Sequence, residues 1–270
     1  MNVTSSLELC RILELTEGAA HADMFRVAPP EFGFEVEQTD DYVARFAPTM
    51  DVMVFNRVVG LGLNSPASRS TVERLVQRYR DKGIKNFAIQ LSPDAQPPEL
   101  YEWMSELGLS VRDFWTKGYR PADAELTVET DLRIEQIDKS QATIFAGVAC
   151  AGFEMPVSLL PLIASPVGLP GWKHYIAWDG DTPAAVAALM VKGDIGWLGI
   201  GATAPEFRRR GAQGALIARR IRDGSALGCR IFVAETGKDL PEKRNPSFHN
   251  MIRTGFIVAY DRPNYMQATQ

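Results

Sequence analysis

The sequence predicts an α/β protein made of two similar halves, and three patterns lead to this interpretation. Short apolar runs typical of strands alternate with segments that have the spacing of amphipathic helices. Glycines stand directly after the expected helices, where left-handed backbone commonly ends a helix. The order of these segments in the first half of the chain returns in the second half, which indicates an internal duplication.

Composition narrows the functional classes. The 270 residues are 46% hydrophobic and can bury a full core without disulfides. The net charge of -4 gives no general attraction for a polyanion, so we expect no nucleic-acid partner. Three widely separated cysteines predict neither a disulfide framework nor a metal site. With no apparent signal peptide and no apolar stretch of about 20 residues, we expect a soluble, cytoplasmic protein with no membrane partner.

The first half, residues 1–124, begins with a weak helical pattern that stops before Pro29. Ser70 is the expected N-cap of a later helix, and Glu73 completes a capping box with it. Residues 121–124 are small and form the expected linker. The remaining elements expected in this half are a strand over 51–63, a helix over 70–82, a strand over 87–91, a helix over 98–107 and a strand over 111–119.

The second half, residues 125–270, contains an expected antiparallel meander. Its three strands are separated by Asp179-Gly180 and Gly193-Asp194, dipeptides that favour tight hairpins. Gly228 and Gly255 follow two helices here, as Gly83 and Gly108 do in the first half. The elements expected are strands over 132–137, 174–178, 184–192, 195–203, 231–235 and 257–260, and helices from 140, over 211–227 and over 246–254.

The clearest functional signal lies between the strand that ends at Thr203 and the helix that follows. Three consecutive arginines, Arg208 to Arg210, stand where the helix dipole is already positive, which is unfavourable unless an anion is bound. Gly211 and Gly214 each cost about 1 kcal/mol relative to alanine in a helix. A phosphate group that docks on bare backbone N–H groups, with guanidinium groups around it, explains both features. We therefore expect residues 207–215 to bind the pyrophosphate of a nucleotide-type cofactor.

The same residues resemble a known motif. Arg208-x-x-Gly211-x-Gln213-Gly214 resembles the Arg/Gln-x-x-Gly-x-Gly/Ala signature of the GCN5-related N-acetyltransferase (GNAT) superfamily, which binds the pyrophosphate of acetyl-coenzyme A. Gln213 departs from the signature, which has Gly or Ala there. Thr203-Ala204-Pro205 and Arg253-Thr254-Gly255-Phe256 resemble two further conserved stretches of that family. The resemblance covers residues 132–265.

The resemblance implies two GNAT-like domains, each with a mixed, largely antiparallel central sheet flanked by helices. Residues 1–124 would form a degenerate copy and residues 125–270 the copy that binds acetyl-coenzyme A, without a metal. The family's pantetheine arm lies between two diverging strands, here 195–203 and 231–235. The cofactor-binding residues expected are Ala202, Thr203, Arg208, Arg209, Arg210, Gly211, Ala212, Gln213, Gly214, Ala215, Ser247 and Asn250.

The implied reaction is direct transfer of the acetyl group to a primary amine of a small molecule or peptide. Family members often carry a proton-donating Tyr where this chain has Met251, so the catalytic residues are left undetermined. Candidates for acid, base or acceptor binding are Glu235, His249, Asn250 and Tyr265. The identity of the acceptor and the oligomeric state, including a homodimer, also stay open.

Other interpretations have less support in the sequence. In the first half, the bend corresponding to the signature contains Pro66 and no paired glycines, so we expect no acetyl-coenzyme A there. Gly199-x-Gly201-x-x-Ala204 matches a dinucleotide fingerprint, but Pro205 stands where its helix would open. No phosphate-binding loop of the GxxxxGK[ST] type is present. A non-catalytic acyl-coenzyme A sensor or scaffold remains the alternative function. Trp172, Trp178 and Trp197 are candidates for the wall of an acceptor cleft, but aromatic residues on strands are more often in the core, where we expect them.

Overall fold

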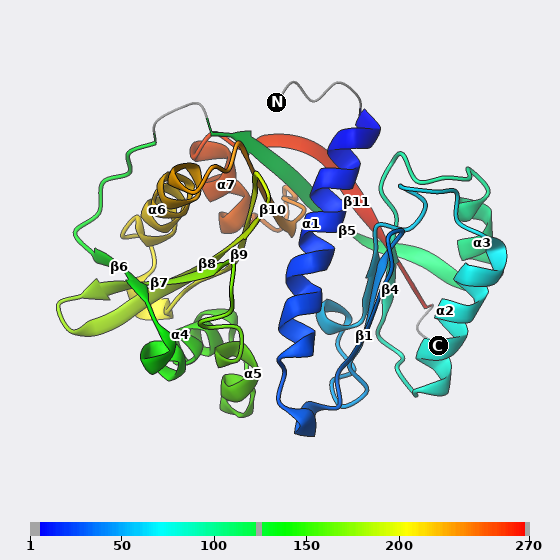
Figure 1. The fold of residues 1–270 in the computed structure, drawn as a ribbon, viewed down its shortest axis with the longest axis horizontal. Coiled ribbons are helices and arrows are strands. Elements are labelled where there is room, and N and C mark those ends of the chain that lie inside the picture. The colour runs from blue at the N-terminus through cyan, green and yellow to red at the C-terminus, as the bar shows by residue number, and fades with distance from the viewer. Residues whose placement is uncertain (1–5, 123–125, 268–270) are drawn as a thin grey trace. The chain divides into compact units, whose positions relative to one another are not determined.

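The structure is a computed structural model that describes residues 6–122 and 126–267, and it forms two compact units (Figure 1). The N-terminal unit runs from the first helix to Lys117 and also contains Thr236–Lys238 and the chain from Ala259 onward. The C-terminal unit contains Gly118–Glu235 and Asp239–Val258. The sequence predicts a single division after residue 124, and that position lies outside the described residues. The chain thus crosses between the units more than once.

The N-terminal unit has strands in the order β1-β2-β3-β4-β11. Neighbours pair antiparallel except β3 and β4, which are parallel. Short 3-10 turns occur at Pro30–Phe32 and Met53–Phe55. Its elements are α1 (Ser6–Arg26), β1 (Glu35–Gln38), β2 (Val43–Phe46), β3 (Arg57–Val59), α2 (Arg69–Asp81), β4 (Ala88–Gln90), α3 (Leu100–Glu106) and the first part of β5 (Leu109–Pro121).

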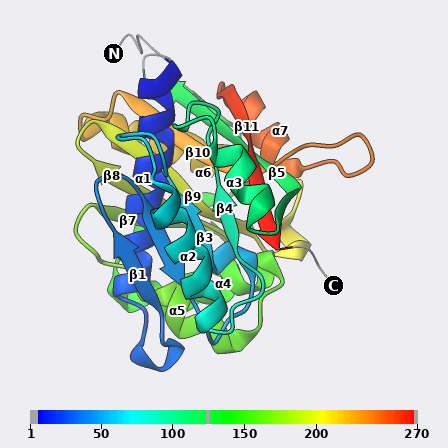
Figure 2. The same cartoon turned by 90° about the vertical axis from the view of Figure 1, so that its right-hand side faces the viewer.

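Helices cover both faces of this sheet. On one face, Ala22 of α1 packs against Val43 and Val59. On the other face lie α2 and α3, which stand in front of the strands in Figure 2. There the ring of Tyr79 stacks on Phe87 with centroids 4.3 Å apart. The apolar stripe of α2 therefore packs against one face of the sheet in a single core.

The C-terminal unit has strands in the order β5-β10-β9-β8-β7-β6. The meander β7-β8-β9 is antiparallel, as the sequence predicts, and β9 pairs parallel with β10. Helices α4 and α6 cover opposite faces of the meander (Figure 1). Its elements are β6 (Arg133–Ile137), α4 (Ala142–Phe153), α5 (Leu160–Ala164), β7 (Trp172–Asp179), β8 (Thr182–Lys192), β9 (Ile195–Thr203), α6 (Ala212–Ala226), β10 (Ile231–Gly237), α7 (Pro246–Arg253) and the start of β11 (Ile257–Gln267).

The order of elements and the pairing of strands repeat. In each half a helix precedes three antiparallel strands, and a helix, a parallel strand, a helix and a final strand follow. The final strand of the second half, β11, pairs with β4 in the N-terminal unit. The end of β5, the final strand of the first half, lies beside β10 in the C-terminal unit. The repeated order agrees with the predicted duplication, and the exchange of last strands could not be foreseen.

Three sequence predictions are wrong in detail. The strand over 51–63 is only Arg57–Val59, because a 3-10 turn precedes it and Gly60 and Gly62 follow with φ of +85° and +78°. Helix α2 is capped by Ser68, whose Oγ accepts from the N–H of Thr71 at 3.1 Å, and not by Ser70. The last strand continues well beyond residue 260. Strands β1 and β2 and helix α5 were not predicted.

Buried residues in the C-terminal unit include the three tryptophans Trp172, Trp178 and Trp197, as expected. Cys10, Cys150 and Cys229 are buried and free. No helix among the described residues is both long enough and apolar enough to cross a membrane.

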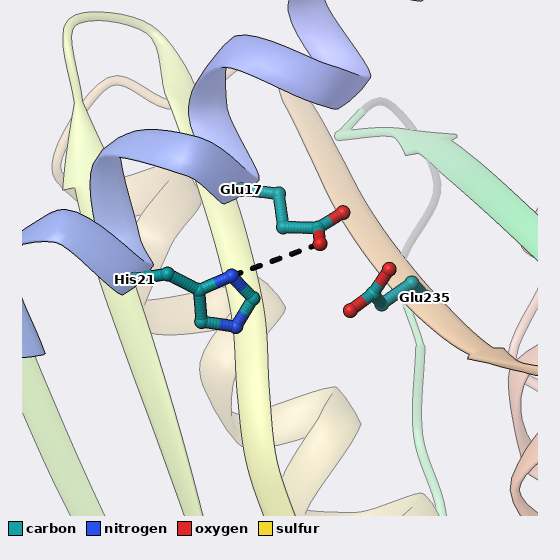
Figure 3. Close-up of side chains that lie close together, drawn as sticks. All are labelled: Glu17, His21 and Glu235. Carbon is teal, nitrogen blue, oxygen red and sulfur yellow. Dashed lines mark ion pairs between the residues drawn. The ribbon is translucent and has the colours of Figure 1, made fainter. Parts of the chain in front are cut away.

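The core of the N-terminal unit holds a buried group of charges. Glu17 on α1 accepts from Lys117 and Arg262, and Arg57 lies 3.5 Å away. Burial alone would raise the pKa of Glu17, but Arg262, Lys117 and Arg57 lower it well below its usual value. His21 faces Glu17 one turn along α1, with Nδ1 3.7 Å from the carboxylate (Figure 3). Burial, with Arg45 and Arg57, lowers the pKa of His21 well below its usual value, so its ring is neutral.

Candidate functional site

Strand β9 separates from its parallel neighbour before it ends. Pairing with β10 is confined to Ile195–Trp197 opposite Ile231–Val233. The register between β9 and β8 shifts between Val186 and Ala188, and Ile200 has the left-handed φ of +50° in this bulge. A bulge bends and twists the strand that carries it. The end of β9 therefore diverges from β10, as the resemblance implies.

Helix α6 begins without a side-chain cap. Its N-cap is Gly211, with φ of +76°, so the first-turn N–H groups receive no capping oxygen from this residue. A Cβ on Gly211 would lie 3.0 Å from the carbonyl oxygen of Glu129, and one on Gly214 would lie 3.0 Å from the Val128 side chain. The two glycines thus allow a close approach of residues 128–130 as well as leaving the helix start bare. An uncapped helix start is a ready anion site.

The three arginines have different surroundings. Arg208 donates to the carbonyl oxygen of Gly152 at 3.2 Å and lies 3.8 Å from the Glu154 carboxylate. Arg209 is exposed and has a left-handed φ of +68°. Arg210 turns away to a bidentate pair with Asp179, with nitrogen–oxygen distances of 2.7 and 3.0 Å, and to Asp131.

The Asp179 and Asp131 carboxylates raise the pKa of Arg210, and the guanidinium in turn lowers that of Asp179. Arg210 therefore ties the loop to the end of β7 and to the segment before β6, whereas Arg208 and Arg209 line the cavity described next. The run of three arginines in the sequence does not distinguish these roles.

These elements enclose a cavity of about 690 Å³. It includes all of the predicted cofactor-binding residues except Arg210 and Ala215; Ala215 is buried on the inner side of α6. The residues that line it are Gly152, Phe153, Gly201, Ala202, Thr203, Phe207, Arg208, Arg209, Gly211, Ala212, Gln213, Gly214, Pro246, Ser247, Asn250 and Arg253. Gly152, Phe153 and Arg253 were not among the predicted cofactor-binding residues, because they come from α4 and α7, far from the signature along the chain.

Helix α7 supplies the opposite wall. Asn245 caps α7, and its side chain accepts from the N–H of Ser247 at 3.0 Å. This cap sets the first turn of α7, so Ser247 and Asn250 lie one turn apart on the wall of the cavity. Arg253 donates to the Oδ1 of Asn250 at 2.6 Å, which orients the carboxamide. The cavity thus combines three arginines, four neutral hydrogen-bonding side chains and the bare start of α6.

The candidates for proton transfer do not gather here. Of the four, only Asn250 lines the cavity. His249 lies 3.2 Å from Asp239, and Glu235 is half-buried on β10. Tyr265 belongs to the N-terminal unit, where its ring lies 6.4 Å from that of Tyr101.

Met251 is buried in the core, where its sulfur would contact a Cβ placed on Gly118. The side chains of the cavity's described lining include no carboxylate, His, Tyr or Cys. The Met251 side chain therefore belongs to the hydrophobic core and takes no part in proton transfer.

The corresponding bend in the N-terminal unit is closed by its own chain. The N–H of Gln96 donates to the carbonyl of Gly62 at 2.8 Å, and the N–H of Ala67 donates to the carbonyl of Gln96 at 2.8 Å. A Cβ on Gly62 would lie 2.4 Å from that Gln96 oxygen, so the approach requires glycine. The Ser68 hydroxyl caps α2. The backbone groups that form an open site in the C-terminal unit are used internally here.

Solved structures share this arrangement. A GCN5-related N-acetyltransferase from Kribbella flavida aligns with a TM-score of 0.66 over 95% of each chain, at 12% identity. One from Sphaerobacter thermophilus gives 0.60 over 92% of each chain, also at 12% identity. The chain has the GNAT fold.

A tandem GNAT protein from the clavulanic acid biosynthesis pathway aligns over 98% of this chain and 94% of its own, with a TM-score of 0.59 and 12% identity. No family model and no curated protein sequence matches the chain. At such identities the GNAT likeness is one of fold, and it extends over both units of the chain.

Proposed function

We propose that the C-terminal unit binds acetyl-coenzyme A and transfers its acetyl group to a primary amine of a small molecule or peptide. The observation that supports this most is the bare N-terminus of α6, which opens into the cavity between β9 and α7. The pyrophosphate would accept hydrogen bonds from N–H groups of residues 211–214, with Arg208 and Arg209 beside it. Backbone groups of Ala202 and Thr203 would pair with the pantetheine arm.

The chemistry needs little from side chains. The neutral amine attacks the thioester carbonyl carbon, the carbon–sulfur bond breaks, and the thiolate leaves with coenzyme A. The nitrogen loses a proton and the thiolate gains one, so an amide and a free thiol are the products. Because the described lining has no group that titrates near neutral pH, water or the acceptor would relay this proton. The protein would then act mainly by holding the thioester in position.

One observation favours a second function. The absence of a carboxylate, His, Tyr or Cys side chain from the described lining, together with Met251 in the core, also suits a protein that binds acyl-coenzyme A without turnover. Release of free thiol from acetyl-coenzyme A across a panel of amines separates the two functions. Acceptor-dependent release supports the transferase, whereas saturable binding with no release on any amine supports the sensor.

The N-terminal unit is proposed to bind no acetyl-coenzyme A. The contacts of Gln96 with Gly62 and Ala67 support this, because they occupy the backbone groups that a cofactor would need. Calorimetric titration should give one equivalent of acetyl-coenzyme A per chain. Two equivalents would overturn the proposal for this unit.

A further inference from the structure

Two side chains of α6 reach across to the bulge at the end of β9. The buried guanidinium of Arg220 donates from one nitrogen to the carbonyls of Ala188 at 3.0 Å and Gly199 at 3.2 Å. The carboxamide of Gln213 donates to the hydroxyl of Thr203 at 3.0 Å and, at the longer distance of 3.5 Å, to the carbonyl of Val186. Residues seven apart on a helix lie on one face, so both side chains point toward β8 and β9.

Their acceptors lie on the two sides of the irregularity. Val186 is opposite Ala202, and Ala188 is opposite Gly199, so Ala187 faces two residues of β9. One of these two is Ile200, a β-branched residue held in the left-handed region. Arg220 binds the strands before this irregularity and Gln213 binds them after it. Together they span the stretch of β9 whose pairing is broken.

The burial of Arg220 is costly and needs a reason. Only 3% of this residue is exposed, and burial lowers the pKa of its guanidinium to about 9. Among the described residues, its hydrogen bonds go to the backbone carbonyls of Leu216, Ala188 and Gly199, and to no carboxylate. A bulge leaves backbone groups without ladder partners, and such groups are unfavourable when buried unless another donor meets them. Arg220 is that donor.

We infer that Arg220 and Gln213 are positioning residues that fix the bulge of β9 and so orient residues 201–203 toward the cavity. All three of these residues line the cavity. The departure of Gln213 from the family signature then has a role, because glycine or alanine at this position could not reach Thr203. The inference rests on the proposed function in one respect, which is that the ligand of the oriented backbone is acetyl-coenzyme A.

The test compares Arg220→Met with Arg219→Met, its neighbour on the same helix. Arg219 pairs with Asp223 at 2.8 Å and donates to the carbonyl of Ile134, away from the bulge. Amide hydrogen exchange is measured first without ligand, and then the dissociation constant for acetyl-coenzyme A. In Arg220→Met, exchange in peptides covering 199–203 should rise by about tenfold or more, and the dissociation constant should rise by about tenfold.

Arg219→Met should leave both quantities within about twofold of the wild type, since the contacts of Arg219 with Asp223 and Ile134 do not involve β9. Arg220→Lys should recover part of the protection, because it restores a buried cation that can donate to the same carbonyls. If Arg220→Met does not fold, Gln213→Ala takes its place and should raise exchange at residues 201–203 alone.

Unchanged exchange at the bulge, an equal rise in Arg219→Met, or faster exchange with an unaltered dissociation constant would each overturn the inference. Failure of the wild type to bind acetyl-coenzyme A would instead refute the proposed function. The exchange comparison without ligand would then still decide whether the two side chains hold the bulge.

Discussion

Substituting Gly211 by Asp or by Asn separates the effect of charge from that of shape at the start of α6. Both side chains have nearly the same size, and both tolerate a left-handed φ better than other residues do. The native φ of +76° and the 3.0 Å approach of the Glu129 oxygen should lower the stability of both variants by about 1–2 kcal/mol. Only Asp adds a negative charge where the pyrophosphate is proposed to bind.

The binding difference can be estimated from Coulomb's law. A carboxylate about 5 Å from a phosphate oxygen, at an effective dielectric constant of about 40, repels it by about 1.7 kcal/mol. This corresponds to roughly 15-fold weaker binding of acetyl-coenzyme A by Gly211→Asp than by Gly211→Asn. Because salt screens exposed charges, the ratio should shrink at high ionic strength.

Isothermal titration of both variants at low and high salt, well below their melting temperatures, measures this ratio. A folding defect alone would give a ratio that does not respond to salt. Equal dissociation constants at low salt would refute the reasoning, because the added charge would then be remote from the ligand.

Three further predictions concern the cores of the units. His174 is 1% exposed, and burial lowers its pKa to about 4. Because its pKa in the unfolded chain is near 6.5, the unfolded state binds more protons than the folded state between about pH 4 and pH 6.5. The free energy of unfolding therefore falls as the pH decreases through this range. At pH 5 the loss is about 2 kcal/mol, and His174→Phe should remove it; an unchanged difference between urea midpoints at pH 5 and pH 8 would contradict this. Glu17→Gln leaves Arg262 and Lys117 without the carboxylate that they share. It should lower the free energy of unfolding of the N-terminal unit by about 3 kcal/mol or more in chemical unfolding. A loss below about 1 kcal/mol would show that the buried charges are not coupled. Gly62→Ala introduces a Cβ 2.4 Å from the Gln96 oxygen and should lower the melting temperature of the N-terminal unit without weakening acetyl-coenzyme A binding; weaker binding would show that this unit contributes to the site.

Local chemistry made much of the fold predictable. Tight turns at Gly180 and Gly193 define the meander, and both glycines have positive φ as those turns require. Strand β2 was missed because all four of its residues are buried, including Arg45, so no alternation marks it. The capping error at α2 arose because Ser68 and Ser70 are chemically equivalent caps in sequence. Only the three-dimensional course of the chain decides between them.

Part of the candidate site could also be predicted from the sequence, and part could not. The loop that starts α6 could be predicted because its glycines and arginines are contiguous. The far wall could not, since Gly152 and Arg253 are brought there by packing between distant elements. The bonding of Arg210 to Asp131 and Asp179 depends on strand order, which the arginine run does not encode. The hydrogen bonds from Arg220 to the carbonyls of Ala188 and Gly199 likewise depend on the register of β8 and β9.

A crystal structure of the full chain with acetyl-coenzyme A tests the central claim most directly. We expect the pyrophosphate oxygens to lie within hydrogen-bonding distance of main-chain nitrogens in residues 211–214, with the pantetheine arm beside Ala202 and Thr203. Density for the diphosphate at any other place, or none at this helix start at saturating ligand, would contradict the account.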